Sequence, residues 1–132
     1  LTRRLRIEGA YTLLEGIDRA TGLPLPQRHR HQGHLKAEYN NPRWGTLVNL
    51  RATFFSKWPL DPASGTYGYG YQIWDLYASK RLRAGFQAFA AIDNLADSTD
   101  RKLSSPTPSF DRPDYGRTFR IGLRYSFTRE TR

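Results

Sequence analysis

The chain has 132 residues, about one domain's worth, and hydrophobic residues make up 38% of it. No stretch approaches the roughly 18 consecutive apolar residues of a membrane-spanning helix, which excludes helical spans but not spanning strands, whose apolar residues occupy every second position. The formal net charge is +9. This charge is compatible with a solvated basic surface or with binding to nucleic acid, anionic lipid or an anionic ligand, and it does not distinguish among them.

Cysteine and methionine are both absent from the chain. The lack of cysteine excludes disulfide and thiolate chemistry and leaves oxidising and reducing compartments equally open. A chain that opens on Leu1, with neither an initiator methionine nor a signal peptide, is expected to be a fragment of a longer protein.

Six segments alternate apolar and polar residues with the period of a strand, and none of useful length has the pattern of an amphipathic helix. The first three cover residues 4–14, 32–39 and 44–57. Their apolar rows are Leu5, Ile7, Tyr11 and Leu13, then Leu35, Ala37 and Tyr39, and then Trp44, Val48, Leu50, Ala52 and Phe54.

The last three segments cover residues 69–81, 83–93 and 117–127. The fourth alternates less cleanly, because Tyr71, Ile73 and Tyr77 oppose its apolar row. Several segments reach the roughly nine to eleven residues of a tilted strand that crosses a bilayer, against a usual strand of about five or six. The sixth carries the apolar row Phe119, Ile121, Leu123, Tyr125 and Phe127.

The connections alternate in length. Residues 15–31, 58–68 and 94–116 form long connections, whereas 40–43 and 81–83 are short. In a meander, this order puts all long connections on one side, as in transmembrane barrels. A soluble domain would need two structureless connections beyond about 12 to 15 residues, which is uncommon. The predicted fold is therefore all-β: an antiparallel up-and-down meander of about six long strands, part of a transmembrane β-barrel.

The faces opposite the apolar rows carry many charged residues. A closed barrel of six strands would be narrower than an eight-stranded barrel, whose interior is just filled by side chains. Burying unpaired charge inside such a narrow six-stranded barrel would be very costly in free energy. The pattern therefore indicates a wide, wet or plugged lumen, with the apolar rows facing lipid and the six strands belonging to a larger barrel. Aromatic residues near the strand ends fit interfacial girdles, although strands favour aromatics anyway.

Several stretches of the sequence resemble a known family. FRIGLRYSF, residues 119–127, resembles the C-terminal β-signal of bacterial outer-membrane proteins, in which alternate apolar residues lead to an aromatic residue and a final Phe. AAIDNLADSTDRK and PDYGRTFRIGLRYSF resemble the last two strands of TonB-dependent outer-membrane receptors. The family's turn after the penultimate strand corresponds to Asn94, Leu95 and Asp97, and its approach to the last strand to Tyr115, Gly116 and Arg117.

The resemblance implies a 22-stranded barrel plugged by an N-terminal domain, in the outer membrane of a Gram-negative bacterium. Residues 1–127 would then form the C-terminal portion of the barrel, its last six strands, with residues 128–132 as a short tail. The implied function is uptake of a scarce, bulky solute such as a ferric siderophore, cobalamin or a glycan, without a cofactor. The implied partners are outer-membrane lipid and lipopolysaccharide, the barrel-assembly machinery, and the rest of the barrel and plug, with TonB acting through the plug.

Two groups of residues are candidates for contact with ligands. Arg51, Arg120 and Arg124 are expected on the lumen face, where they hold plug carboxylates, guide an anionic substrate or form structural ion pairs. His29, Arg30 and His31 are expected to form a solvated basic loop rather than a metal site, because further ligands are missing. If functional, they would contact an anionic ligand or a lipopolysaccharide phosphate.

An enzyme and a nucleic-acid-binding domain are the two other function classes to compare with this sequence. The sequence contains no nucleophile elbow, phosphate-binding glycine loop or HExxH motif, so no catalytic residue is predicted. The alternative to a receptor is a basic, aromatic-rich β-domain that binds single-stranded nucleic acid. That interpretation is disfavoured because aromatic and arginine side chains are predicted on opposite faces, whereas a nucleic-acid platform mixes them. Nucleic acid is therefore not expected as a partner.

Overall fold

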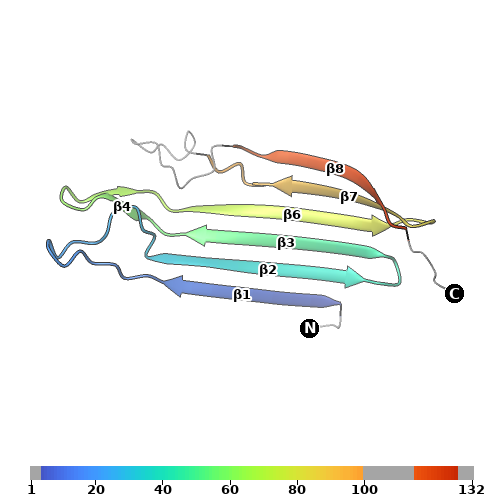
Figure 1. The fold of residues 1–132 in the computed structure, drawn as a ribbon, viewed down its shortest axis with the longest axis horizontal. Coiled ribbons are helices and arrows are strands. Elements are labelled where there is room, and N and C mark those ends of the chain that lie inside the picture. Colours follow the sequence, from blue (N-terminus) through green and yellow to red (C-terminus); the bar gives the residue numbers. More distant parts are fainter. Residues whose placement is uncertain (1–3, 100–114, 128–132) are drawn as a thin grey trace.

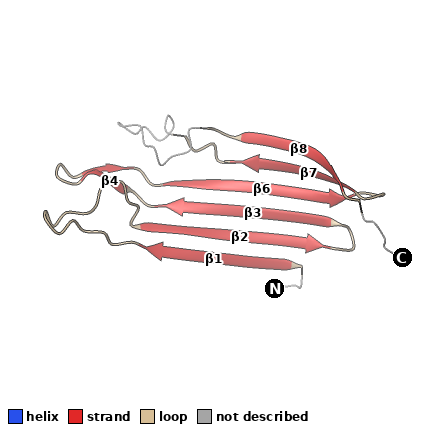
Figure 2. Ribbon diagram, viewed as in Figure 1, coloured by secondary structure: helices blue, strands red, loops and turns tan. Residues whose placement is uncertain are grey.

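The structure is a computed structural model that describes residues 4–99 and 115–127. These residues form one six-stranded antiparallel sheet and a separate two-stranded hairpin (Figures 1 and 2). No helix long and apolar enough to cross a membrane occurs in the described residues. The sheet contains β1 (Leu5–Leu13), β2 (His31–Asn41), β3 (Thr46–Phe55), β6 (Tyr71–Arg81), β7 (Phe86–Asp93) and β8 (Thr118–Tyr125), and the hairpin contains β4 (Trp58–Asp61) and β5 (Thr66–Gly68).

The six long strands form a meander in the order β1-β2-β3-β6-β7-β8. The described parts of the long connections lie at one end of the sheet, which we call the loop end, and the two tight turns lie at the other, the turn end (Figure 1). The predicted all-β fold, the meander and the alternation of connections are thus confirmed. The sheet remains open in the described part of the chain, because β1 and β8 are its two edge strands.

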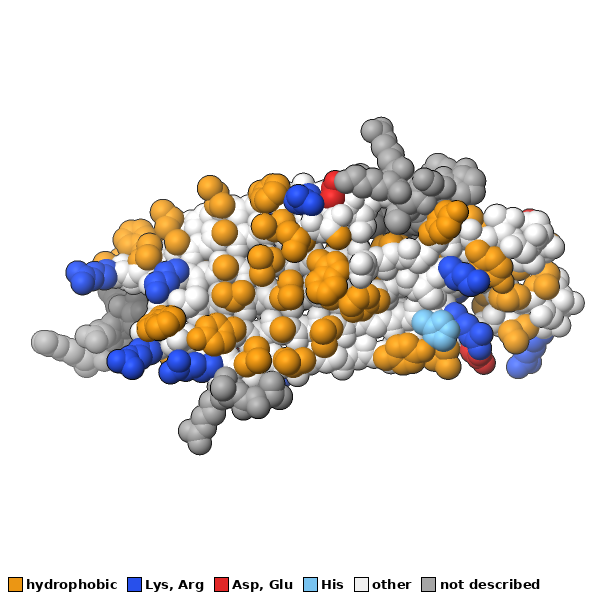
Figure 3. Space-filling model, turned by 180° about the vertical axis from the view of Figure 1, so that it is seen from behind, with side chains coloured by type: hydrophobic (Ala, Val, Ile, Leu, Met, Phe, Trp, Pro, Cys, Tyr) orange, Lys and Arg blue, Asp and Glu red, His pale blue; other side chains and the backbone are white. Residues whose placement is uncertain are grey.

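One face of the sheet is apolar from edge to edge. The strand register aligns residues across all six strands, and aligned residues in a sheet project to the same side. Figure 3 shows this apolar face, with hydrophobic side chains over its centre and Lys and Arg side chains towards both ends. Two aligned rows are Leu5, Tyr39, Val48, Ala78, Ala90 and Ile121, and Ile7, Ala37, Leu50, Leu76, Ile92 and Phe119.

The opposite face, the charged face, carries most of the ionic side chains of the strands. Its aligned rows are Arg6, Glu38, Asn49, Tyr77, Ala91 and Arg120, and Glu8, Lys36, Arg51 and Asp75. Ion pairs join Arg6 to Glu8, and Lys36 to Glu38 at 3.3 Å. The predicted separation of arginines from aromatics is incomplete, because Phe55, Tyr71, Tyr77 and Phe89 lie on this charged face.

Within residues 4–99 and 115–127, no protein interior covers the apolar face. The hydrophobic residues buried in the described chain are Ala52, Trp58, Tyr71 and Ala91. By contrast, Ile121 is 87% exposed and Leu123 is 69% exposed. Such large exposed apolar surfaces are typical of surfaces that contact lipid or a protein partner.

The tight turns shift the predicted strand ends. The third strand was predicted over residues 44–57, but β3 begins at Thr46 because Gly45 adopts a φ of +61° and its N–H donates to the Pro42 carbonyl at 3.2 Å. Trp44 therefore lies in the turn rather than on the strand. Between β6 and β7, Ala84 and Gly85 both have positive φ, and the Phe86 N–H donates to the Arg83 carbonyl at 3.3 Å, as in a type I′ turn.

Residues 58–68, which were predicted as a long connection, contain the β4–β5 hairpin, which the sequence pattern did not indicate. Trp58 packs over Gly68, where an added Cβ would lie 2.5 Å from the indole ring. In the hairpin turn, the Ala63 N–H donates to Asp61 Oδ1 at 3.1 Å. The side chain of Ser64 and the N–H of Ala63 lower the pKa of Asp61 below its ordinary 3.8, because hydrogen bonds to a carboxylate favour its charged form.

Candidate functional site

Asn94 organises the turn where β7 ends. It is buried, with 1% exposure, and adopts a φ of +53°, which asparagine tolerates better than most residues. Its Nδ2 donates to the carbonyls of Ser98 at 3.0 Å and Tyr115 at 3.3 Å, and its Oδ1 accepts from the Ser98 N–H at 2.9 Å. One side chain thereby joins the end of β7 to the chain that enters β8.

Asp97 provides the second link of the same turn. Its N–H donates to the Asn94 carbonyl at 2.8 Å, and its Oδ1 accepts from the N–H of Arg117 at 2.9 Å. The turn also reaches β6, because the Leu95 N–H donates to the Trp74 carbonyl at 2.7 Å. These contacts give Asn94 and Asp97 a structural role in shaping the loop end of the sheet.

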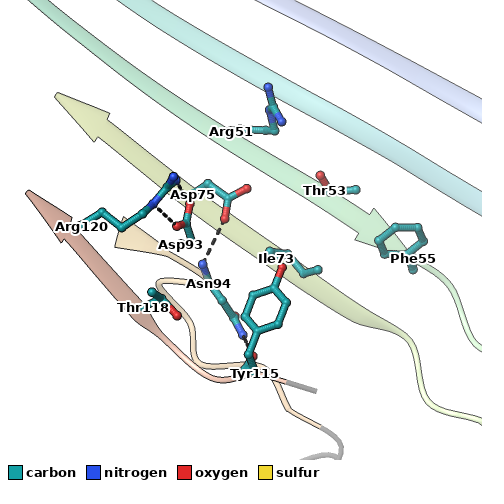
Figure 4. Close-up of a pocket in the computed structure, with 10 residues that line it drawn as sticks. All are labelled: Arg51, Thr53, Phe55, Ile73, Asp75, Asp93, Asn94, Tyr115, Thr118 and Arg120. Atoms are coloured by element: carbon teal, nitrogen blue, oxygen red, sulfur yellow. Dashed lines mark hydrogen bonds and ion pairs between the residues drawn. The ribbon is translucent and has the colours of Figure 1, made fainter. Parts of the chain in front are cut away.

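A cavity of about 600 Å³ lies on the charged face beside this turn (Figure 4). Arg120 on β8 makes a two-point ion pair with Asp93 on β7, with Nε–Oδ2 at 2.8 Å and Nη2–Oδ1 at 2.9 Å. Asp75 on β6 accepts a hydrogen bond from the Asn94 N–H at 3.0 Å. The cavity is lined by Arg51, Thr53, Phe55, Ile73, Asp75, Asp93, Asn94, Tyr115, Thr118 and Arg120.

The three candidate arginines differ in their surroundings. Arg51 and Arg120 line the same cavity, whereas Arg124 lies near the turn end, opposite Gln87. Arg51 is aligned with Asp75 on the neighbouring strand, but across residues 4–99 and 115–127 no ion pair joins its guanidinium to a carboxylate. An exposed arginine in a cavity wall can therefore receive an anionic group from outside these strands.

His29, Arg30 and His31 lie close together at the loop end but point to different partners. His29 packs among Phe55, Trp58 and Tyr71, with ring centroids 5.0, 6.1 and 5.7 Å away, and its Nδ1 lies 2.6 Å from the Ser56 carbonyl oxygen. Arg30 forms an ion pair with Glu15. His31 Nδ1 lies 2.6 Å from the Tyr11 hydroxyl. The three side chains thus have three separate sets of partners.

No group of three or more His, Cys, Asp or Glu side chains in the described ranges is arranged to hold a metal ion. Sequence reasoning missed Asp75 as a member of the cavity wall. Its position between Trp74 and Leu76 puts it on the face opposite those apolar residues, a signal that could have identified it. The predicted tail, residues 128–132, and residues 100–114 of the last long connection lie outside the described residues.

Comparison with protein families supports the geometry. Residues 2–95 match the family model described as "TonB dependent receptor-like, beta-barrel". No curated protein and no solved structure matched the chain. The family match and the resemblance of residues 90–127 rest on largely different parts of the chain and agree. The family match and the resemblance both favour a receptor over a nucleic-acid-binding domain. The matched family is one of receptors and transporters, not of enzymes. The chain therefore belongs to the TonB-dependent receptor β-barrel family.

Proposed function

We propose that residues 1–127 form a C-terminal arc of the barrel wall of a TonB-dependent receptor in the outer membrane of a Gram-negative bacterium. The observation that carries this proposal is a sheet with one apolar, exposed face and one charged face. The longest strands, β2 and β6, have 11 residues each, or roughly 36 Å at 3.3 Å per residue. Tilted by about 45°, they rise roughly 25 Å, the height of the apolar band of such barrels.

The remaining strands of the receptor would complete the barrel. The edge strands β1 and β8 leave backbone groups that must pair with further strands, since unpaired edges promote association. The charged face would then line the lumen and meet a plug domain, through which TonB acts. The row Phe119 to Phe127 would serve as the β-signal for the barrel-assembly machinery, and residues 128–132 as a tail beyond it.

The cavity on the charged face is the proposed contact point with plug or solute. It lies beside the Asn94 turn at the loop end, which this arrangement places outside the cell. Arg120 is neutralised by Asp93, and its role is structural. Arg51 is the residue we assign to a plug carboxylate or to an anionic part of the transported solute. The solute class, a scarce bulky compound such as a siderophore, cobalamin or glycan, follows from the family alone.

Thiol labelling of intact cells tests the orientation of these strands. The chain has no cysteine, so Ala63→Cys at the loop end and Arg83→Cys at the turn end each add its sole thiol. Both positions are exposed. A membrane-impermeant maleimide should label Ala63→Cys in intact cells and Arg83→Cys only after the outer membrane is opened. The reverse pattern, or equal labelling of both in intact cells, would contradict the proposal.

A further inference from the structure

A second cavity lies at the loop end, between the β1–β2 connection and the β4–β5 hairpin. Its volume is about 510 Å³. Backbone contacts build its walls: the Leu25 N–H donates to the Gly16 carbonyl at 2.9 Å, and the Gln27 N–H donates to the Pro59 carbonyl at 2.9 Å. The apolar part of its lining consists of Leu14, Ile17, Pro24, Leu25, Pro59 and Tyr67.

The polar part of this lining is cationic. Arg28, Arg30 and Lys57 line the cavity, and Glu15 is the acidic side chain among the lining residues. Glu15 is already paired with Arg30, and Lys57 Nζ lies 4.9 Å from the centre of the Tyr67 ring. The cavity therefore keeps an excess of positive charge beside an apolar wall. This combination suits an amphiphile with a multiply charged anionic head.

The cavity adjoins the apolar face of the sheet. His31 is one of its lining residues, and the register aligns His31 with Leu13 on that face. Figure 3 shows a histidine with basic and acidic neighbours at this end of the apolar face, beside hydrophobic side chains. A lipid lying against the sheet can therefore place its head group in the cavity without leaving the apolar surface.

We propose that this cavity binds a multiply phosphorylated glycolipid of the outer leaflet. Arg28, Arg30 and Lys57 would contact the phosphate groups, and the apolar lining would receive the first part of an acyl chain. Three cations against one carboxylate favour a phosphorylated head group over a zwitterionic one. The inference rests on the proposed function, because it requires the loop end to lie at the outer surface of the membrane.

Native mass spectrometry of the purified full-length receptor with a defined bisphosphorylated lipid A tests this site. The test variant is Arg28→Ala with Lys57→Ala, and the matched control is Arg19→Ala with Arg83→Ala, which removes equal charge from exposed positions outside the cavity. The dissociation constant should rise roughly tenfold or more in the test variant, because charge-assisted contacts are lost, and should change little in the control. Equal effects in both variants would overturn the proposal.

Three further probes identify the chemistry. Dephosphorylated lipid A, the deacylated bisphosphorylated disaccharide and inorganic phosphate should each bind more weakly than the intact lipid. If either acyl-free anion binds as tightly, the cavity is a general anion site and the lipid proposal is wrong. Arg28→Lys with Lys57→Arg keeps both charges and should retain binding, which separates loss of charge from misfolding.

The labelling of Ala63→Cys separates this proposal from the proposed function. Labelling only in opened cells would refute the orientation and, with it, both proposals. Labelling in intact cells together with lipid binding that the cavity variants do not alter would refute the lipid site alone.

Discussion

The Phe89 ring packs against Gly122 on the charged face. They are aligned on β8 and β7, and a Cβ on Gly122 would lie 2.6 Å from Phe89 Cζ. The phenyl ring thus occupies the space that a side chain at position 122 would need. Contact between Phe89 and Gly122 therefore stabilises the packing of β8, which is an edge strand of the described sheet, against β7.

Replacing Gly122 by Val should force the Phe89 ring from its place. Overpacking of this kind costs about 1–3 kcal/mol. Denaturant unfolding of the receptor in detergent, followed by tryptophan fluorescence, should show a lower midpoint for Gly122→Val. Gly122→Val should cost less in the Phe89→Ala background than in the wild-type receptor, since the clash is then absent. No loss in the single variant, or an equal loss in both backgrounds, would refute the contact.

Asn94 contributes three side-chain hydrogen bonds to the family turn. Asn94→Ala removes three side-chain bonds and places alanine at a φ of +53°. At about 1 kcal/mol per bond, with about 1 kcal/mol more for the left-handed conformation, the unfolding free energy should fall by about 2–4 kcal/mol.

The control for that change is Asn94→Gly, which accepts positive φ and loses only the side-chain bonds. Denaturant unfolding should rank the two variants with Asn94→Gly less damaged than Asn94→Ala. Equal damage would show that the backbone conformation contributes nothing, and no damage in either would remove Asn94 from its structural role.

At the scale of single elements, the β6–β7 turn contains a residue poorly suited to its conformation. Ala84 adopts a φ of +57° next to Gly85 at +77°, and the Asn-Gly pair is preferred in type I′ turns. Ala84→Asn should therefore stabilise the receptor by about 0.5–1 kcal/mol. Thermal unfolding monitored by circular dichroism measures this gain. Ala63→Asn, in a turn position without positive φ, should give none, and an equal gain there would contradict the explanation.

The β4–β5 hairpin should respond to acid. The folded pKa of Asp61 lies below its ordinary 3.8, so its contribution to hairpin stability is present above the unfolded pKa and disappears as pH falls through the folded pKa. The amide signal of Ala63, whose N–H donates to Asp61, should shift in an NMR titration below about pH 4. Asp61→Asn should abolish that shift. A shift that persists in Asp61→Asn would assign it to another group.

The long strands could be predicted from the sequence because their alternation has the period of a sheet. The same signal placed the start of the third strand at Trp44, because this aromatic residue continues the apolar row of the strand. In the structure β3 begins at Thr46, because the positive φ of Gly45 ends the extended conformation. The β4–β5 hairpin was missed because its strands have four and three residues, too few for periodicity to register.

The candidate site was predictable only in part. The alternation along each strand predicted that Arg51 and Arg120 lie opposite the apolar rows, and the register aligns both with residues of the charged face. The alternation of side chains along one strand does not show which strands are neighbours or how they align. The ion pair between Arg120 and Asp93 was therefore not predicted. The scatter of His29, Arg30 and His31 depends on loop contacts that no local pattern encodes.

At the scale of the whole molecule, the described strands form a single-layered sheet rather than a closed, packed core. The two faces differ in chemistry along the full length of the strands, and the packed hydrophobic residues at the loop end are few. In water, the apolar face and both open edges would favour association. In a membrane, lipid hydrocarbon would contact the apolar face, and the water of the barrel lumen would solvate the charged face.

Spin labels on neighbouring residues test that assignment of the two faces most directly. Leu50→Cys and Leu123→Cys report from the apolar face, and Arg51→Cys, next to Leu50 on β3, reports from the charged face. In receptor reconstituted in lipid bilayers, the first two labels should be relaxed mainly by oxygen, which concentrates in hydrocarbon, and the third mainly by a water-soluble nickel chelate. Chelate access at Leu50 and Leu123, or labels immobilised there as in a packed protein core, would contradict the account.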